Sequence, residues 1–221
     1  MRKVIGAAFV SLDGVMQGPG GPDEDPTGGF GFSGWLPPVG DDAIEQKIGE
    51  LFGRPFDLLL GRRTYDIFAA YWPYAGDAMA GIRDPFNKCT KYVVTRGDRP
   101  LVWNNSERID GVEALRAIKQ GDGPDLVIQG SSTLYPQLLA DGLLDELTLM
   151  ISPVVLGHGK RLFGDGTPPG TLKMTDHRVS DGGNIIATYH PAGPVETGTY
   201  VHEKPSDREQ ARQAAMAEGR W

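Results

Sequence analysis

Hydrophobic and polar residues follow two different periods along this chain, and the two periods alternate. Short apolar runs bounded by glycine, proline or aspartate are typical of strands that are buried on both faces of a sheet. Between these runs, apolar residues recur at helical spacing, as at positions 44, 48, 51 and 52. The pattern predicts strands at 3–12, 56–61, 91–96, 101–105, 124–130 and 145–155, and helices at 41–53, 63–71, 111–123 and 132–142.

The last part of this pattern predicts a hairpin. Segment 175–191 holds two strand-like stretches around Asp181-Gly182-Gly183, which suits a tight turn. Strands that alternate with helices form a parallel sheet with helices on both faces, and a closing hairpin adds an antiparallel edge. We therefore expect an α/β fold of three layers, with a mixed, mostly parallel central sheet and a C-terminal antiparallel hairpin.

Two segments lie outside this alternation. Residues 13–35 form a loop rich in glycine and proline, and loops of this length in a compact domain are usually functional or disordered. The polar segment 194–221 carries a capping box, Ser206 with Glu209, ahead of a short alanine-rich helix. We expect one domain over 1–193 and a tail over 194–221 that is either a flexible terminus or a docking arm.

Composition narrows the function classes. The chain has 221 residues, of which 39% are hydrophobic, enough for a sizeable core, and its formal net charge of −7 disfavours nucleic acid and anionic membranes as partners. We expect a cytoplasmic protein, because no run of about 18 apolar residues is present. The single Cys89 cannot form an intramolecular disulfide, and the four histidines lack metal-ligand spacing, so we expect no metal.

Three predicted strands end in residues that suit anions. In an open α/β sheet, ligands collect outside the carboxyl ends of the strands. These ends offer Gly61-Arg62-Arg63-Thr64, Thr95-Arg96 and Gly130-Ser131-Ser132-Thr133-Leu134, which supply backbone N–H groups, hydroxyls and guanidinium groups. Each turn alone is also explained by helix capping. Together they indicate a long ligand with several phosphates, and the arginines favour NADPH over NADH. The usual Gly-x-Gly-x-x-Gly fingerprint is absent after the first strand, and there is no Walker sequence.

Five ordered blocks resemble a known family. They are "SLDG" (11–14), "LLLGRRTYD" (58–66), "YVVTR" (92–96), "LVIQGSSTLYPQLL" (126–139) and "DELTLMISPVVLGHGKRLF" (145–163). The chain is similar to the dihydrofolate-reductase-like superfamily, in the branch of the reductase domain of the bifunctional riboflavin-pathway deaminase/reductase. The resemblance implies an NADPH-dependent reductase that forms homodimers.

The resemblance also implies roles for individual residues. Gly61 to Thr64 would bind the phosphates of the coenzyme, Thr95 and Arg96 the phosphate on its adenosine ribose, and Gly130 to Leu134 its pyrophosphate. The nicotinamide would be lined by Ala8 and by the loop that opens at Asp13, Gly14, Val15 and Met16.

A reductase also needs a proton source and a substrate site. NADPH supplies the hydride, so the protein must supply a proton from a carboxylic acid or an ordered water. Asp13, Asp42 and Glu45 are the candidates, although a turn, a helix cap and a solvated helix face explain them almost as well. Thr148 would point from its strand towards the cleft and bond the substrate or the carboxamide, or serve only the structure.

The loop 15–35 bears on the substrate. It contains no Lys or Arg, which argues against a phosphorylated substrate, although cations from other segments would compensate. Phe30, Phe32 and Trp35 suggest a flat, apolar or heteroaromatic substrate beneath a lid, or else a packing cluster. We expect a reductase of a small heterocycle, such as a riboflavin-pathway pyrimidine. The alternatives are a dihydrofolate reductase and a non-catalytic protein that binds or senses NADPH.

Overall fold

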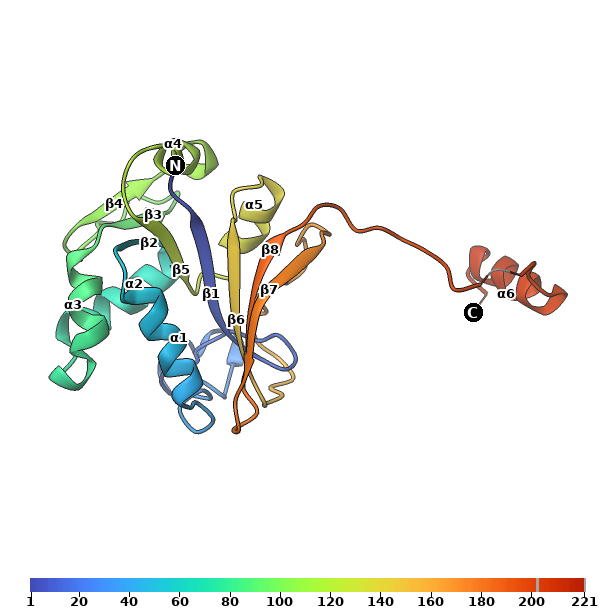
Figure 1. Ribbon diagram of the computed structural model, residues 1–221, viewed down its shortest axis with the longest axis horizontal. Helices are drawn as coiled ribbons and strands as arrows, with labels where there is room; N and C mark the ends of the chain where they lie inside the picture. The colour runs from blue at the N-terminus through green and yellow to red at the C-terminus, as the bar shows by residue number, and fades with distance from the viewer. Residues whose placement is uncertain (202, 221) are drawn as a thin grey trace.

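The computed structural model describes residues 1–201 and 203–220, and its centre is one eight-stranded sheet (Figure 1). The strands lie in the order β4-β3-β2-β5-β1-β6-β8-β7. All neighbours from β4 to β6 are parallel, while β8 pairs antiparallel with β6 and β7. The strands are β1 (Val4–Ser11), β2 (Phe56–Gly61), β3 (Lys91–Val94), β4 (Ser106–Ile109), β5 (Asp125–Gln129), β6 (Glu146–Ser152), β7 (Leu172–Val179) and β8 (Ile185–Pro191).

Helices cover both faces of this sheet, as the alternating pattern predicts. They are α1 (Asp42–Phe52), α2 (Arg62–Tyr71), α3 (Ala80–Lys88), α4 (Gly111–Gln120), α5 (Leu134–Ala140) and α6 (Asp207–Ala217), with short 3-10 turns at Thr27–Gly29, Trp72–Tyr74 and Asp77–Met79. Successive strand residues face opposite ways, so Leu59 packs with α4 and α5, whereas Leu58 and Leu60 pack with α1, α2 and α3. The strands read as continuous apolar runs because both faces are buried.

Near the middle of the chain, one predicted strand was wrong and one helix was missed. The expected strand at 101–105 is a loop, and the real strand β4 is the more polar Ser106–Ile109. Trp103 is buried in that loop, where its backbone N–H donates to the Tyr65 hydroxyl over 2.8 Å, so its apolar character reflects loop packing. Helix α3 was not predicted, because Gly81 and Pro85 both lower helix propensity within it.

The loop before α1 is fastened to the closing hairpin. Asp41, and not Asp42, caps the helix, because its Oδ1 accepts from the backbone N–H groups of Ala43 and Ile44. Its Oδ2 accepts from Ser180 and Asn184 in the β7–β8 turn. These bonds lower the pKa of Asp41, first through Ser180 and then through Asn184. One aspartate therefore fixes both α1 and the hairpin.

Helix α6 lies apart from the sheet in Figure 1, at the end of the chain. The Ser206 side chain accepts from the backbone N–H of Glu209, which is the predicted N-terminal cap. No residue of α6 is buried. No helix among residues 1–201 and 203–220 is long and apolar enough to cross a membrane.

Candidate active site

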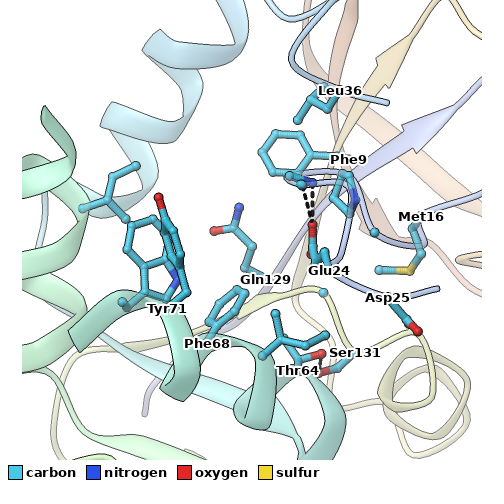
Figure 2. Close-up of a pocket in the computed structure, with 18 of the residues that line it drawn as sticks. Phe9, Met16, Glu24, Asp25, Leu36, Thr64, Phe68, Tyr71, Gln129 and Ser131 are labelled. Carbon is cyan, nitrogen blue, oxygen red and sulfur yellow. Dashed lines mark hydrogen bonds between the residues drawn. The ribbon is translucent and has the colours of Figure 1, made fainter. Parts of the chain in front are cut away.

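A cavity of about 1330 Å³ opens at the carboxyl ends of the central strands. Phe9 of β1, Gly61 of β2 and Gln129 of β5 lie at its floor, and α1, α2 and the loop 16–25 form its walls (Figure 2). This is the position where open α/β sheets bind ligands. The cavity is large enough for a coenzyme and a small substrate together.

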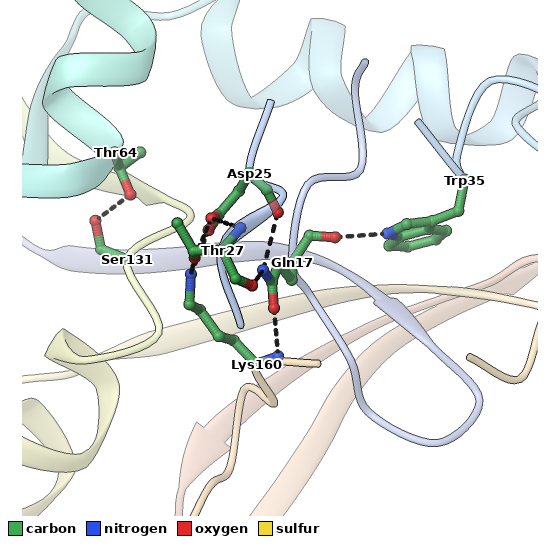
Figure 3. Close-up of polar contacts among 7 residues, drawn as sticks. All are labelled: Gln17, Asp25, Thr27, Trp35, Thr64, Ser131 and Lys160. Atoms are coloured by element: carbon green, nitrogen blue, oxygen red, sulfur yellow. Dashed lines mark hydrogen bonds and ion pairs between the residues drawn. The ribbon is translucent and has the colours of Figure 1, made fainter. Parts of the chain in front are cut away.

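Two of the three predicted anion turns meet in this cavity. The Ser131 hydroxyl accepts from the Gly61 backbone N–H over 2.7 Å and lies 2.9 Å from the Thr64 hydroxyl (Figure 3). Gly130 has φ +88°, and a Cβ there would lie 3.1 Å from Thr64 Cγ2, so only glycine fits this approach. The next residue, Ser131, is also left-handed at φ 65°, a strained conformation for a non-glycine residue.

The predicted site residues divide between the cavity and its surroundings. Ten of them line it: Met16, Glu45, Gly61, Arg62, Arg63, Thr64, Gly130, Ser131, Ser132 and Thr133. The others lie outside the lining: Ala8, Asp13, Gly14, Val15, Trp35, Asp42, Thr95, Arg96, Leu134 and Thr148. Ala8 and Val15 are buried in packing clusters.

The arginines differ in how they are held. The Arg62 side chain bonds to Asp66 and to the carbonyls of Arg99 and Pro100, so it ties α2 to the loop after β3. Arg63 is exposed, and its guanidinium has no partner in the described part of the chain. Arg96 follows β3, where Val94 pairs with Gly61, so it lies at the same sheet edge but beyond the cavity lining.

Asp13 does not have the properties of the proton donor that the sequence suggested. Its carboxylate accepts from the Ser11 hydroxyl and from the backbone N–H groups of Leu156 and Gly157, which lie 2.9–3.0 Å away. Hydrogen bonds from Ser11 first, and then from those amides, lower the pKa of Asp13 to about 2. This ionised carboxyl lies outside the cavity lining and fixes loops together instead. Asp42 is exposed on α1, also outside the lining.

Two glutamates do face the cavity. Glu45 is exposed on α1. Glu24, which the sequence interpretation missed, lies in the loop 16–25, where its Oε2 accepts from the backbone N–H groups of Gly20 and Gly21 over 2.5 and 3.2 Å. Burial raises the pKa of Glu24 above its usual range, despite those two bonds. A half-buried carboxyl with a raised pKa suits proton donation.

The loop 16–25 is held in place by a polar network, drawn in Figure 3. The Gln17 side chain donates to the carbonyls of Asp25 and Thr27 and accepts from the backbone N–H of Lys160 over 3.0 Å. Lys160 pairs with Asp25 over 2.5 Å. Burial alone would raise the pKa of Asp25, but the bonds and charge of Lys160, with Thr27, lower it. This network positions Glu24 over the cavity.

Trp35 and Thr148 are not placed to bind the substrate. Trp35 is buried with Val15 and Phe30, and its indole N–H donates to the Gln17 carbonyl over 2.9 Å. It therefore supports the loop from behind. Thr148 is fully buried between strands, with its hydroxyl 3.1 Å from that of Thr188, because its strand position faces the packed interior.

The end of the cavity near α1 and α2 is apolar instead. Its lining there consists mainly of aliphatic and aromatic side chains: Leu36, Ile44, Ile48, Phe52, Phe68, Tyr71, Trp72, Met79 and Ile82. Five of these residues lie in helices that the sequence predicts, and only the fold reveals that they border a cavity: Ile44, Ile48, Phe52, Phe68 and Tyr71. Aromatic side chains therefore do border the cavity, but they are not the predicted Phe30, Phe32 and Trp35.

The sheet order and the closing hairpin define a dihydrofolate-reductase-like fold. Within that class the chain belongs to the RibD C-terminal domain family, whose model matches residues 2–187.

The chain is also similar to a curated protein and to several solved structures. The chain is 29% identical over 199 residues to the uncharacterised protein YyaP of Bacillus subtilis, covering 86% of this chain and 95% of that protein. A putative riboflavin biosynthesis protein from Shewanella sp. PV-4 has a similar structure, with a TM-score of 0.62 at 18% identity, covering 86% and 99% of the two chains. Dihydrofolate reductase from Enterococcus faecalis, complexed with NADP(H) and RAB-propyl, matches with a TM-score of 0.53 at 16% identity, covering 86% and 96%.

Proposed function

We propose that this protein is an NADPH-dependent reductase that transfers a hydride to a small heterocyclic substrate. The observation that carries the proposal is the meeting of two turns, Gly61–Thr64 and Gly130–Thr133, on one cavity. The first turn opens α2, whose free N-terminal N–H groups and positive dipole end favour a phosphate. A bisphosphate-linked coenzyme would be held between the two turns.

Other residues would then select the coenzyme. Arg63 is free at the cavity wall, and Arg96 lies beyond the lining at the same sheet edge. An extended dinucleotide whose pyrophosphate lies at the glycine turns would direct its adenosine end towards Arg96, where a ribose phosphate would gain a charge-assisted bond. The Enterococcus faecalis neighbour, which is complexed with NADP(H), has the same fold and supports this choice.

The chain's own contribution to the chemistry would be binding, orientation and proton supply. When bound, NADPH supplies a hydride to an electrophilic carbon of the substrate and leaves as NADP⁺. The neighbouring atom of the reduced bond then takes a proton, for which Glu24 is our preferred source and Glu45 the alternative. The loop 16–25 would keep bulk water away from the reacting atoms.

Steady-state oxidation of NADPH, followed by absorbance with a panel of pterins, pyrimidines and quinones, tests this function. We expect turnover with a heterocycle of this panel at a rate that depends on protein concentration. Tight NADPH binding without turnover of any compound would favour a coenzyme-sensing protein, and turnover of dihydrofolate alone would favour a dihydrofolate reductase.

A further inference from the structure

Gln129 occupies a distinctive position in the cavity. It is the last residue of β5 and directly precedes the turn Gly130–Thr133. Figure 2 shows its amide projecting into the cavity between the rings of Phe68 and Tyr71 and the ring of Phe9. The side chain therefore stands at the junction between the phosphate-binding turns and the apolar end of the cavity.

The Gln129 amide is available for a ligand. The residue is half-buried, and no side chain or backbone group in residues 1–201 and 203–220 hydrogen-bonds to its amide. A primary amide offers one acceptor and two donors side by side. It is complementary to a ring edge on which an N–H lies next to a C=O, because the two bonds then form in one plane.

The surrounding rings select for a flat ligand. Phe68 and Tyr71 lie on α2, and Phe9 lies on β1, so aromatic surface from two elements borders the amide. A planar ring that bonds Gln129 would contact these faces over its own apolar area, where stacking adds to the burial of surface.

The charges around this end argue against a phosphate on the substrate. The cations that line the cavity are Arg62, Arg63 and Lys160. Lys160 is paired with Asp25, and the two arginines begin α2, five to six residues before Phe68, which is on the order of 8 Å along the helix. Asp23 lines the same cavity, and its carboxylate would repel a phosphate.

We propose that Gln129 is the residue that selects the substrate, and that the substrate is a flat, uncharged heterocycle with a lactam edge and no phosphate group. The proposal rests on the proposed function for the identity of the reaction. It goes further by naming the recognition group and the substrate class.

Calorimetric titration with lumazine and quinazoline-2,4-dione, two uncharged lactams, tests this inference on the full chain, with and without NADP⁺. The variants are Gln129→Leu and the control Gln137→Leu, whose glutamine is exposed on α5 away from the cavity. We expect both lactams to bind the parent and Gln137→Leu alike, and Gln129→Leu about tenfold more weakly. We also expect 1,3-dimethyl derivatives, which lack the N–H, to bind all three proteins equally and weakly.

The outcomes separate this inference from the proposed function. Equal lactam affinity in the parent and in Gln129→Leu would overturn the inference about Gln129. Absence of lactam binding to all three proteins would overturn it as well. Uridine 5′-monophosphate binding at least tenfold tighter than uridine would overturn the exclusion of phosphate. Weaker NADP⁺ binding in Gln129→Leu with unchanged lactam binding would assign Gln129 to the coenzyme. Absence of NADP⁺ binding in the parent would contradict only the proposed function.

Discussion

Glu24 and Asp13 show how the environment of a carboxyl decides its role. Both lie near the loop that closes the cavity, and both accept two backbone N–H bonds. Asp13 also accepts from the Ser11 hydroxyl and stays ionised, whereas burial favours the protonated form of Glu24. Only Glu24 therefore has both the position and the pKa direction of an acid.

Replacing Glu24 by Gln should lower kcat for NADPH oxidation by about 100-fold or more, the usual contribution of a positioned acid. Because the protonated carboxyl is the donor, activity in the parent should fall as the pH rises through the raised pKa of Glu24. The pH–rate profile of Glu24→Gln should lack that step. The neighbouring Asp23→Asn variant serves as the control. An unchanged kcat in Glu24→Gln would move the role to Glu45 or to water.

Asp13→Asn should destabilise the fold by about 1–2 kcal/mol at pH 7, because the amide cannot accept the same three bonds. The pKa of Asp13 is lowered, so its contribution is fully present above pH 4 and is lost as the pH falls towards about 2. The free energies of unfolding of the parent and of Asp13→Asn, measured with urea, should therefore differ at pH 7 and converge as the pH approaches about 2. A constant difference between them would contradict this role.

At the scale of residues, the sequence predicted members of the cavity lining where chemistry and position coincide. Gly61, Thr64 and Gly130 were identifiable because several strands end in such turns, although helix capping explains each turn alone, and these three residues do line the cavity. Glu24 was not, since its loop has no periodicity and its burial depends on the contacts of Lys160 and Gln17. Nor was Gln129, because a residue ending a strand does not reveal whether its amide is paired.

At the scale of elements, strands with strong apolar runs were predictable and strands at the polar edge were not. β1, β2, β5 and β6 are buried on both faces, so their sequences carry the signal. β4 pairs only with β3 and is partly exposed, so its sequence is polar. Trp103, in the loop before β4, is apolar because its side chain is buried in that loop. The signal at 101–105 came from packing against Tyr65, a contact between distant segments.

A buried ion pair joins the starts of the central strands. Arg2, just before β1, pairs with Asp57 in β2, and both side chains are at most 10% exposed. The other Asp57 oxygen accepts from the Thr90 backbone N–H over 2.9 Å, just before β3. Asp57 therefore aligns the starts of β1, β2 and β3, at the ends of the strands opposite the cavity.

Asp57→Ala should lower the free energy of unfolding by about 3–5 kcal/mol, because it leaves the buried Arg2 charge without its ion-pair partner. Asp77→Ala is a matched control, since Asp77 is fully exposed and pairs with Arg83, and its effect on the free energy of unfolding should be much smaller. Denaturant unfolding measures both. Similar losses in the two variants would show that the buried pair has no special role.

At the scale of the whole molecule, the tail contacts the domain that holds the sheet at its base, where the Thr171 hydroxyl donates to the Pro194 carbonyl over 2.8 Å. Helix α6 buries no residue and lies apart from the sheet. The exposed strand β7 at the sheet edge agrees with the expected homodimer, which stays a prediction.

Deleting residues 194–221 should leave the melting temperature and the NADPH affinity of the remaining domain unchanged. We expect this because no residue of α6 is buried. Thermal unfolding and fluorescence titration of the shortened chain test this. A clear loss of stability or affinity would instead make the tail an arm that docks on this chain or on a partner copy.

The central claim is that the turns at the ends of β2 and β5 hold NADPH, with arginines selecting its extra phosphate. Fluorescence titration of the parent with NADPH and NADH tests it most directly, alongside Arg63→Ala, Arg96→Ala and the control Arg54→Ala, whose exposed arginine lies outside the cavity. We expect the parent and Arg54→Ala to bind NADPH at least about tenfold more tightly than NADH, and the preference to fall in Arg63→Ala or Arg96→Ala. Equal affinity of the parent for the two coenzymes, or binding of neither, would contradict the account.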